Sequence, residues 1–302
     1  MIRHGVSDTV AAGKPAVTGA VNMKRFSPTT AAIVCCLLWQ TAAAQSIEQI
    51  LKQHYPQHSA QNQCLLGKSF RYYSGDTPTP VRGDYCFIID AQQTVNTAQG
   101  KMRYILLTGN GIDLKTGEWQ TAHVDSGAVG MLVLKARADG GWQIVAANTG
   151  MPVGAFGSAP QNWALHQFGP DTWGFINQSS DIHQGYAGSR HVILLPLGNK
   201  ISMSQITAES DNSGALGECG ADMGFDSAAE WQDCRSRRET ITSRLNIDHG
   251  GTTVAGLYPL QLTVNGFSGN KKYRNQIVRI PFDRVAGQYR EPKSSPLRGA
   301  DF

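Results

Sequence analysis

Residues 131–147 read Met131-Leu132-Val133-Leu134-Lys135-Ala136-Arg137, then Ala138-Asp139-Gly140-Gly141, then Trp142-Gln143-Ile144-Val145-Ala146-Ala147. Two apolar runs flank a short polar segment, in which Asp139 and Gly140 allow the backbone to reverse tightly. This pattern predicts an antiparallel β-hairpin. We therefore expect a chain built mainly from strands.

The same β pattern recurs along the rest of the sequence. Apolar and polar side chains alternate at residues 258–264 and again at residues 278–282, as in strands that bury one face. Further strands are predicted at residues 85–90, 103–108, 191–197 and 240–247.

Helical signals are few. Ser46 can cap a short helix over residues 46–54, and Asp226 or Ser227 can cap another over residues 226–235. The sequence thus predicts a mainly β fold, an antiparallel sandwich or barrel-like domain with one or two short helices. An α+β fold is the alternative.

The region around residues 23–45 has the order of a secretory signal peptide. Lys24 and Arg25 precede an apolar stretch at residues 31–39, and Ala42-Ala43-Ala44 offers a small-residue cleavage site before Gln45. The stretch is too short for a stable transmembrane anchor. We predict Met23 as the true start, residues 1–44 as an upstream extension plus signal peptide, and a periplasmic or secreted mature chain. Cys35 and Cys36 lie inside the apolar stretch and so do not predict lipid attachment.

The remainder is long enough for a substantial core, and we expect a single β-rich domain over residues 45–290. Residues 291–302 contain two prolines and few apolar side chains, which predicts a loose C-terminal tail. Residues 1–44 hold four of the 27 Lys and Arg and one of the 23 Asp and Glu, so 23 basic and 22 acidic residues remain. Such a balance argues against a nucleic-acid partner.

Four cysteines follow the signal peptide: Cys64, Cys86, Cys219 and Cys234. An even number in an oxidising compartment predicts two disulfides. The local pairing, Cys64 with Cys86 and Cys219 with Cys234, is favoured because each bond closes a short loop. The spacing lacks the Cys-x-x-Cys pairs of a structural zinc site.

Several well-known catalytic signatures are missing from the sequence. It has no Gly-x-Ser-x-Gly elbow, no His-Glu-x-x-His helix, no phosphate-binding loop and no dinucleotide-binding turn. These absences favour a protein that binds rather than one that catalyses.

Chemically versatile residues are densest between Trp163 and His191. Residues 177–190 are polar and glycine-rich, which predicts a long loop, and loops often carry binding or catalytic groups. Asp181 and His183 are two residues apart, so in extended chain they share a face. The carboxylate could then orient the imidazole as a general base or metal ligand. The alternative is an ordinary turn in which Asp181 caps the backbone.

Two further Asp/His neighbours could join His183 if the fold brings them together, namely His123 with Asp125 and Asp248 with His249. Such a set would suit zinc. The alternative interpretation is that these are turn residues at strand ends. Otherwise we expect no cofactor.

Aromatic side chains offer another kind of site. Trp163, Trp173 and Tyr186, together with Arg190, are candidate ligand-binding residues, because rings can stack on a sugar while Arg190 reads its hydroxyls. Trp119 is a further candidate. Trp142 is expected in the core, given its position in the hairpin.

The leading hypothesis is an exported, disulfide-stabilised protein of a bacterial envelope that binds a small molecule, a glycan or an envelope protein without catalysis. The alternative is a periplasmic or secreted hydrolase that uses Asp181 and His183, either alone or with a metal ion.

Overall fold

The computed structural model of the protein describes residues 44–74, 79–219 and 227–297. The predicted signal peptide, including Cys35 and Cys36, therefore lies outside the described residues apart from Ala44. Strands dominate the described part, and two short α-helices occur in it, so the prediction of a mainly β fold is confirmed. None of its helices has the length and apolar character needed to cross a membrane.

The first sheet has six antiparallel strands that lie side by side in chain order. They are β1 (Gln57–Ser59), β2 (Cys64–Ser74), β3 (Thr79–Thr97), β4 (Gly100–Ile112), β5 (Gly127–Ala136) and β6 (Trp142–Val153). β5 and β6 are the hairpin predicted from residues 131–147, with Ala136 opposite Trp142. Gly140 in their connection has a φ of 82°, a conformation that glycine adopts without steric cost.

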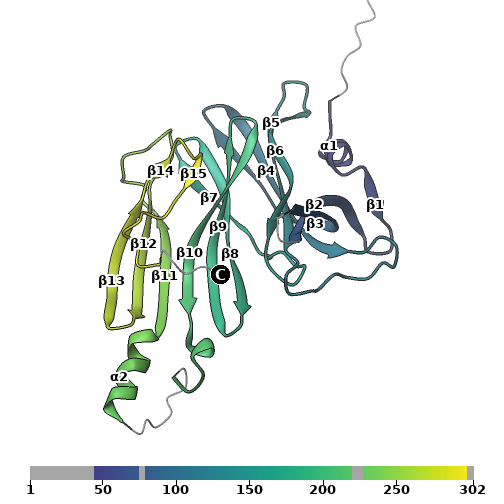
Figure 1. Ribbon diagram of the computed structural model, residues 1–302. Helices are drawn as coiled ribbons and strands as arrows, with labels where there is room; N and C mark the ends of the chain where they lie inside the picture. Colours follow the sequence, from purple (N-terminus) through teal and green to yellow (C-terminus); the bar gives the residue numbers. More distant parts are fainter. Residues whose placement is uncertain (1–43, 75–78, 220–226, 298–302) are drawn as a thin grey trace, which may run out of the picture. The chain divides into compact units, whose positions relative to one another are not determined.

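The second sheet has seven antiparallel strands, again in chain order. Figure 1 shows β8 to β13 as a continuous series. The strands are β7 (Ala164–Gly169), β8 (Thr172–His183), β9 (Tyr186–Leu197), β10 (Lys200–Asp211), β11 (Glu239–Ile247), β12 (Leu260–Ser268) and β13 (Lys271–Ile280). The two alternating C-terminal runs pair as neighbours in β12 and β13, with Leu260 opposite Ile280.

The two helices begin at the predicted serine caps. Ser46 precedes α1 (Ile47–His54). Its hydroxyl accepts a hydrogen bond from the Gln49 backbone amide, and the Gln49 side-chain oxygen accepts one from the Ser46 backbone amide. Ser227 caps α2 (Ala228–Arg237) by accepting from the Glu230 amide. The 3₁₀ helix η1 (Ser213–Cys219) leads from β10 towards α2.

Strands β4 and β5 are apolar on both faces because each face meets a different core. Alternate residues of β4 separate accordingly: Leu106 packs with Phe175 and Leu194 of the second sheet, whereas Leu107 packs under α1 with Ile50. A third core covers the other face of the second sheet. Two cavities border the inter-sheet core defined by Leu106, Phe175 and Leu194.

The pairing between β10 and β11 is short, because only Glu209, Ser210 and Asp211 of β10 pair with β11. A C-terminal segment covers the rest of this β10 edge through the small hairpin of β14 (Phe282–Asp283) and β15 (Gln288–Tyr289). The Ser202 hydroxyl donates to the Gly287 carbonyl, and the Thr207 amide donates to the Glu291 carboxylate.

Beyond β15 the chain remains attached to the second sheet. Leu297 is 1 % exposed and belongs to the core on that side. Residues 291–297 therefore differ from the loose tail expected for residues 291–302, and residues 298–302 lie outside the described part. Few apolar side chains suffice here because Leu297 is fully buried and Glu291 binds the backbone of β10.

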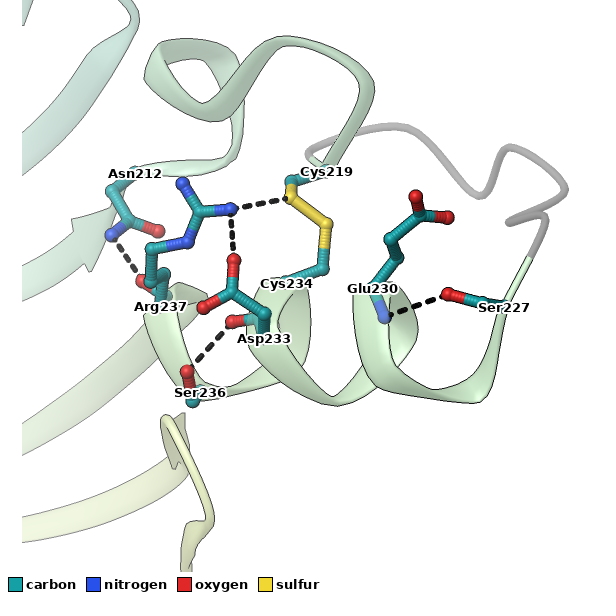
Figure 2. Close-up of a disulfide and its surroundings, with 8 residues drawn as sticks. All are labelled: Asn212, Cys219, Ser227, Glu230, Asp233, Cys234, Ser236 and Arg237. Carbon is teal, nitrogen blue, oxygen red and sulfur yellow. Dashed lines mark hydrogen bonds and ion pairs between the residues drawn. A yellow bond between two sulfur atoms is a disulfide. The ribbon is translucent and has the colours of Figure 1, made fainter.

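Both predicted disulfides, Cys64–Cys86 and Cys219–Cys234, are confirmed. Figure 2 shows the second, which joins η1 to α2. A guanidinium nitrogen of Arg237 lies 3.4 Å from the Cys219 sulfur and 2.6 Å from the Asp233 carboxylate. The Asn212 amide donates to the Arg237 carbonyl, so α2 is tied to the end of β10.

Candidate functional site

The polar segment at residues 177–190 is a β-hairpin, so the prediction of a long loop was wrong. β8 continues to His183, β9 begins at Tyr186, and Gln184 and Gly185 form the turn with φ values of 49° and 85°. Two consecutive positive φ angles match the twist of a two-residue hairpin. Most side chains here are at least partly exposed, so main-chain pairing holds the strands without apolar alternation.

One face of this hairpin contributes to the inter-sheet core at one end and lines a polar cavity at the other. On β9, Leu194 and Val192 lie in the core, and Arg190 and Gly188 follow on the same face. Ser179 of β8 is opposite Arg190, and Asp181 is opposite Gly188. Since glycine has no side chain, space remains in front of Asp181.

The cavity has a volume of about 270 Å³, and we call it the serine pocket. Residues 152–154 at the end of β6 form an opposing wall. Its remaining polar and charged lining residues are Ser126, Ser179, Ser180, Asp181, Ser189, Arg190 and Gln205.

The pocket holds two opposite charges that do not neutralise each other. Arg190 as a residue is partly buried, and its guanidinium makes no hydrogen bond or ion pair with any described residue. Oδ1 of Asp181 accepts from the Ile182 amide at 2.8 Å and lies 3.0 Å from Nε2 of His123, whereas Oδ2 has no partner within the described ranges. The Arg190 guanidinium and Oδ2 of Asp181 are therefore both available to bind a ligand.

His123 reaches the tip of the hairpin from the connection between β4 and β5. Its Nε2 lies 2.6 Å from the Ile182 carbonyl oxygen as well as 3.0 Å from Asp181 Oδ1. Both neighbours are acceptors, so Nε2 carries a hydrogen and donates. The ring stacks on His183, with 5.5 Å between centroids, and meets the edge of Phe156 at 4.6 Å.

The fold thus brings together Asp181, His183 and His123, which sequence reasoning had considered jointly. The described part of the chain nevertheless contains no group of three His, Cys, Asp or Glu residues arranged to hold a metal ion. No pocket serine makes a hydrogen bond to His123 or His183 there, and the Ser126 hydroxyl instead donates to the carbonyls of Phe70 and Arg71. A serine nucleophile needs a base within hydrogen-bond reach, and within the described residues neither histidine stands in that relation to a serine of the pocket.

Asp125, two residues beyond His123, has a separate role. Its carboxylate is 2 % exposed and forms two 2.7 Å hydrogen bonds with the Arg71 guanidinium of β2. This pair fixes the connection that carries His123 and Ser126 onto the first sheet.

Asp248 and His249 do not join the other histidines. Asp248 lies 3.3 Å from the Arg279 guanidinium of β13, and His249 packs edge-on against Tyr258. They form the turn after β11, as expected from the alternative interpretation.

The aromatic candidates are separated by the fold. Trp163 is 4 % exposed in the inter-sheet core, and its indole donates to the Pro160 carbonyl, so its ring faces no ligand. Trp173 packs against the same core, whereas Tyr186 and Trp119 are about half exposed. Trp142 is half-buried under the Arg103 guanidinium.

Sequence reasoning missed the serines and Gln205 of the pocket. Serine carries no motif of its own, and Ser126 and Gln205 come from segments distant in sequence from the hairpin. Only the even spacing of Ser179 and Asp181 could have suggested a shared face.

A second cavity, of about 360 Å³, borders the inter-sheet core near Met102, Tyr104, Val133 and Leu257. Asp171 is the one charged residue among those that line it, and its Oδ1 already accepts from the Ala98 amide at 2.8 Å. Its lining therefore offers fewer groups for a specific polar ligand.

Comparison of the chain with protein-family models, with curated proteins and with solved structures found no match.

Proposed function

We propose that the protein is an exported, non-catalytic binding protein of the bacterial envelope that takes a small polar ligand into the serine pocket. The observation that carries this proposal is the Arg190 guanidinium, which lines the pocket without a partner among the described residues. A guanidinium forms strong parallel hydrogen bonds with an anionic group, so one that lies beside several hydroxyls without a protein partner favours a ligand.

Export is supported by the two disulfides, since disulfides persist in oxidising compartments. The signal-like order of residues 23–45 points the same way. Mass spectrometry of the protein from cell fractions tests this part: we expect a mature chain beginning at Gln45 in the envelope or medium. An uncleaved chain in the cytoplasm would contradict it.

Binding is tested by a thermal-shift screen of sugars, organic acids, phosphates and amino acids against the mature chain. A ligand that occupies the pocket raises the melting temperature through its preference for the folded state. Ser179→Trp fills the pocket and should abolish the shift. Gln178→Trp, on the neighbouring exposed position of β8, is the matched control and should keep it. Absence of any shift across all four classes would refute the proposal.

A hydrolase is the second candidate, because His123, Asp181 and His183 meet beside a pocket that contains four serines. A fluorophosphonate probe, which labels activated serines, decides between the two functions. We expect no labelling of the folded protein beyond that of a heat-denatured sample. Labelling that His123→Ala or His183→Ala removes would favour the hydrolase.

A further inference from the structure

We infer that the ligand of the serine pocket is a small zwitterion, with its anionic group on Arg190 and its cationic group on Asp181. This inference rests on the proposed function, and it names the chemical class of the ligand. Its basis is the arrangement of charge in the pocket.

Arg190 and Asp181 share a face of the β8–β9 hairpin. Arg190 is opposite Ser179, and Asp181 is two residues beyond Ser179 on β8. The two residues are therefore diagonal neighbours, whose Cα atoms are about 7–8 Å apart in such a pair. The absent side chain of Gly188 leaves room for a compact ligand beside Asp181.

Arg190 and Asp181 line the same pocket but do not form an ion pair with each other. All donors of the Arg190 guanidinium and the Oδ2 atom of Asp181 lack partners among the described residues. A guanidinium binds a carboxylate or phosphate through parallel hydrogen bonds, and a carboxylate accepts readily from an ammonium group. Each charged residue thus has a natural counterpart on a ligand.

Simpler ligands fit the pocket less well. A plain anion would bind Arg190 but would be repelled by Asp181, and a plain cation would meet the opposite problem. Within the described chain none of the residues that line the pocket is aromatic, so a sugar ring would find no stacking surface there. Ser179, Ser180 and Gln205 supply neutral donors and acceptors for the rest of a small polar molecule.

Two sources share this chemistry, namely free α-amino acids and the phosphoethanolamine head group of a lipid. The first experiment is isothermal titration of the mature chain with the common amino acids and, separately, with O-phosphoethanolamine. Saturable binding of either probe supports the inference, and the tighter class identifies the source. If neither probe binds, the inference is wrong.

The second experiment removes one charge at a time from the probe. For the tightest amino acid, the N-acetyl derivative lacks the ammonium group and the amide derivative lacks the carboxylate. For phosphoethanolamine, N-acetylation removes the ammonium charge, and the neutral triester formed with two methyl groups removes the anionic charge. We expect each change to weaken binding ~10- to 100-fold, the range for losing a charge-assisted hydrogen bond. A derivative that binds as tightly as its parent would overturn the inference.

Matched variants assign each charge to a residue. Asp181→Asn keeps an oxygen for the Ile182 amide and for His123 but removes the charge, so it should weaken the parent probe and spare the N-acetyl derivative. Arg190→Gln should weaken the parent and spare the probe that lacks the anion, while Arg190→Lys restores part of the affinity. Equal losses for all probes would indicate a merely structural role and refute the assignment.

The failure of this inference can be distinguished from failure of the proposed function. If a sugar or a simple organic acid binds and Ser179→Trp blocks it, the pocket is a binding site but its ligand is not a zwitterion.

Discussion

Replacing Asp125 with Ala removes the carboxylate that holds the connection between β4 and β5 against β2. Asp125 is 2 % exposed, and both of its oxygens bond the Arg71 guanidinium at 2.7 Å. Breaking a buried ion pair by deleting one partner costs about 3–5 kcal/mol, because the other charge loses its compensation. Since 24 % of the Arg71 side chain stays exposed, water can solvate part of it, and we expect about 3 kcal/mol, the low end of that range.

The assay is urea denaturation with the disulfides intact, supported by a thermal scan in which a loss of this size lowers the melting temperature by about 6–12 °C. Asp84→Ala is the matched control, because it removes the ion pair of Asp84 with Lys68, whose side chain is 69 % exposed. Exposed pairs contribute about 0–1 kcal/mol. If Asp125→Ala destabilises the protein no more than Asp84→Ala does, the reasoning on burial is refuted.

Three further predictions concern other parts of the molecule. Replacing Cys219 and Cys234 together with Ala should lower the free energy of unfolding by about 3 kcal/mol, since the bond closes a loop with a sequence separation of 15; an unchanged urea midpoint would contradict this. Leu297→Ala should lower the free energy of unfolding by about 2–5 kcal/mol because the side chain is 1 % exposed, whereas the exposed control Lys293→Ala should leave it almost unchanged. Equal urea midpoints for the two variants would support the loose tail expected from the sequence. Burial lowers the pKa of His191 below its ordinary value of 6.5, so the unfolded chain binds a proton first on acidification. Stability from neutral His191 is therefore complete above about pH 6.5 and is lost as the pH falls below it. His191→Phe should flatten that slope in urea titrations between pH 5 and 7, and the exposed His58→Gln should not; a slope that His191→Phe leaves unchanged would count against burial as its cause.

The strands and disulfides were predictable because their signals are local. The turn at Asp139 and Gly140 and the alternation in residues 258–264 and 278–282 each depend on neighbours in sequence. Cys64 and Cys219 pair with the nearest following cysteine, as loop closure favours.

The β8–β9 hairpin escaped prediction because its polar side chains hide the strand pattern. Main-chain pairing holds it, and the positive φ angles of Gln184 and Gly185 reverse the chain without an Asn-Gly signal. Trp163 illustrates a second limit. The Asp90 carboxylate binds its backbone amide across 73 residues, and the ring packs into the inter-sheet core, so only the fold reveals its burial.

Of the candidate site, the sequence supplied Asp181, His183 and Arg190 but not their surroundings. The meeting of His123 with Asp181 depends on contacts 58 to 59 residues apart, and the pocket depends on how β6 approaches β9. Such contacts arise from tertiary packing and follow no regular spacing in the sequence. The sequence could therefore suggest that these residues form a site, but only the structure shows which of them meet.

The C-terminal cover of β10 has a consequence for biosynthesis. After Ser202 leaves the ribosome, 85 more residues must follow before the Gly287 carbonyl can bond its hydroxyl. Until then the nascent second sheet presents an open strand edge, which is prone to mispairing with other chains. If the chain is exported, as we propose, this late closure of the second sheet would help to keep the polypeptide unfolded until it enters a translocation channel.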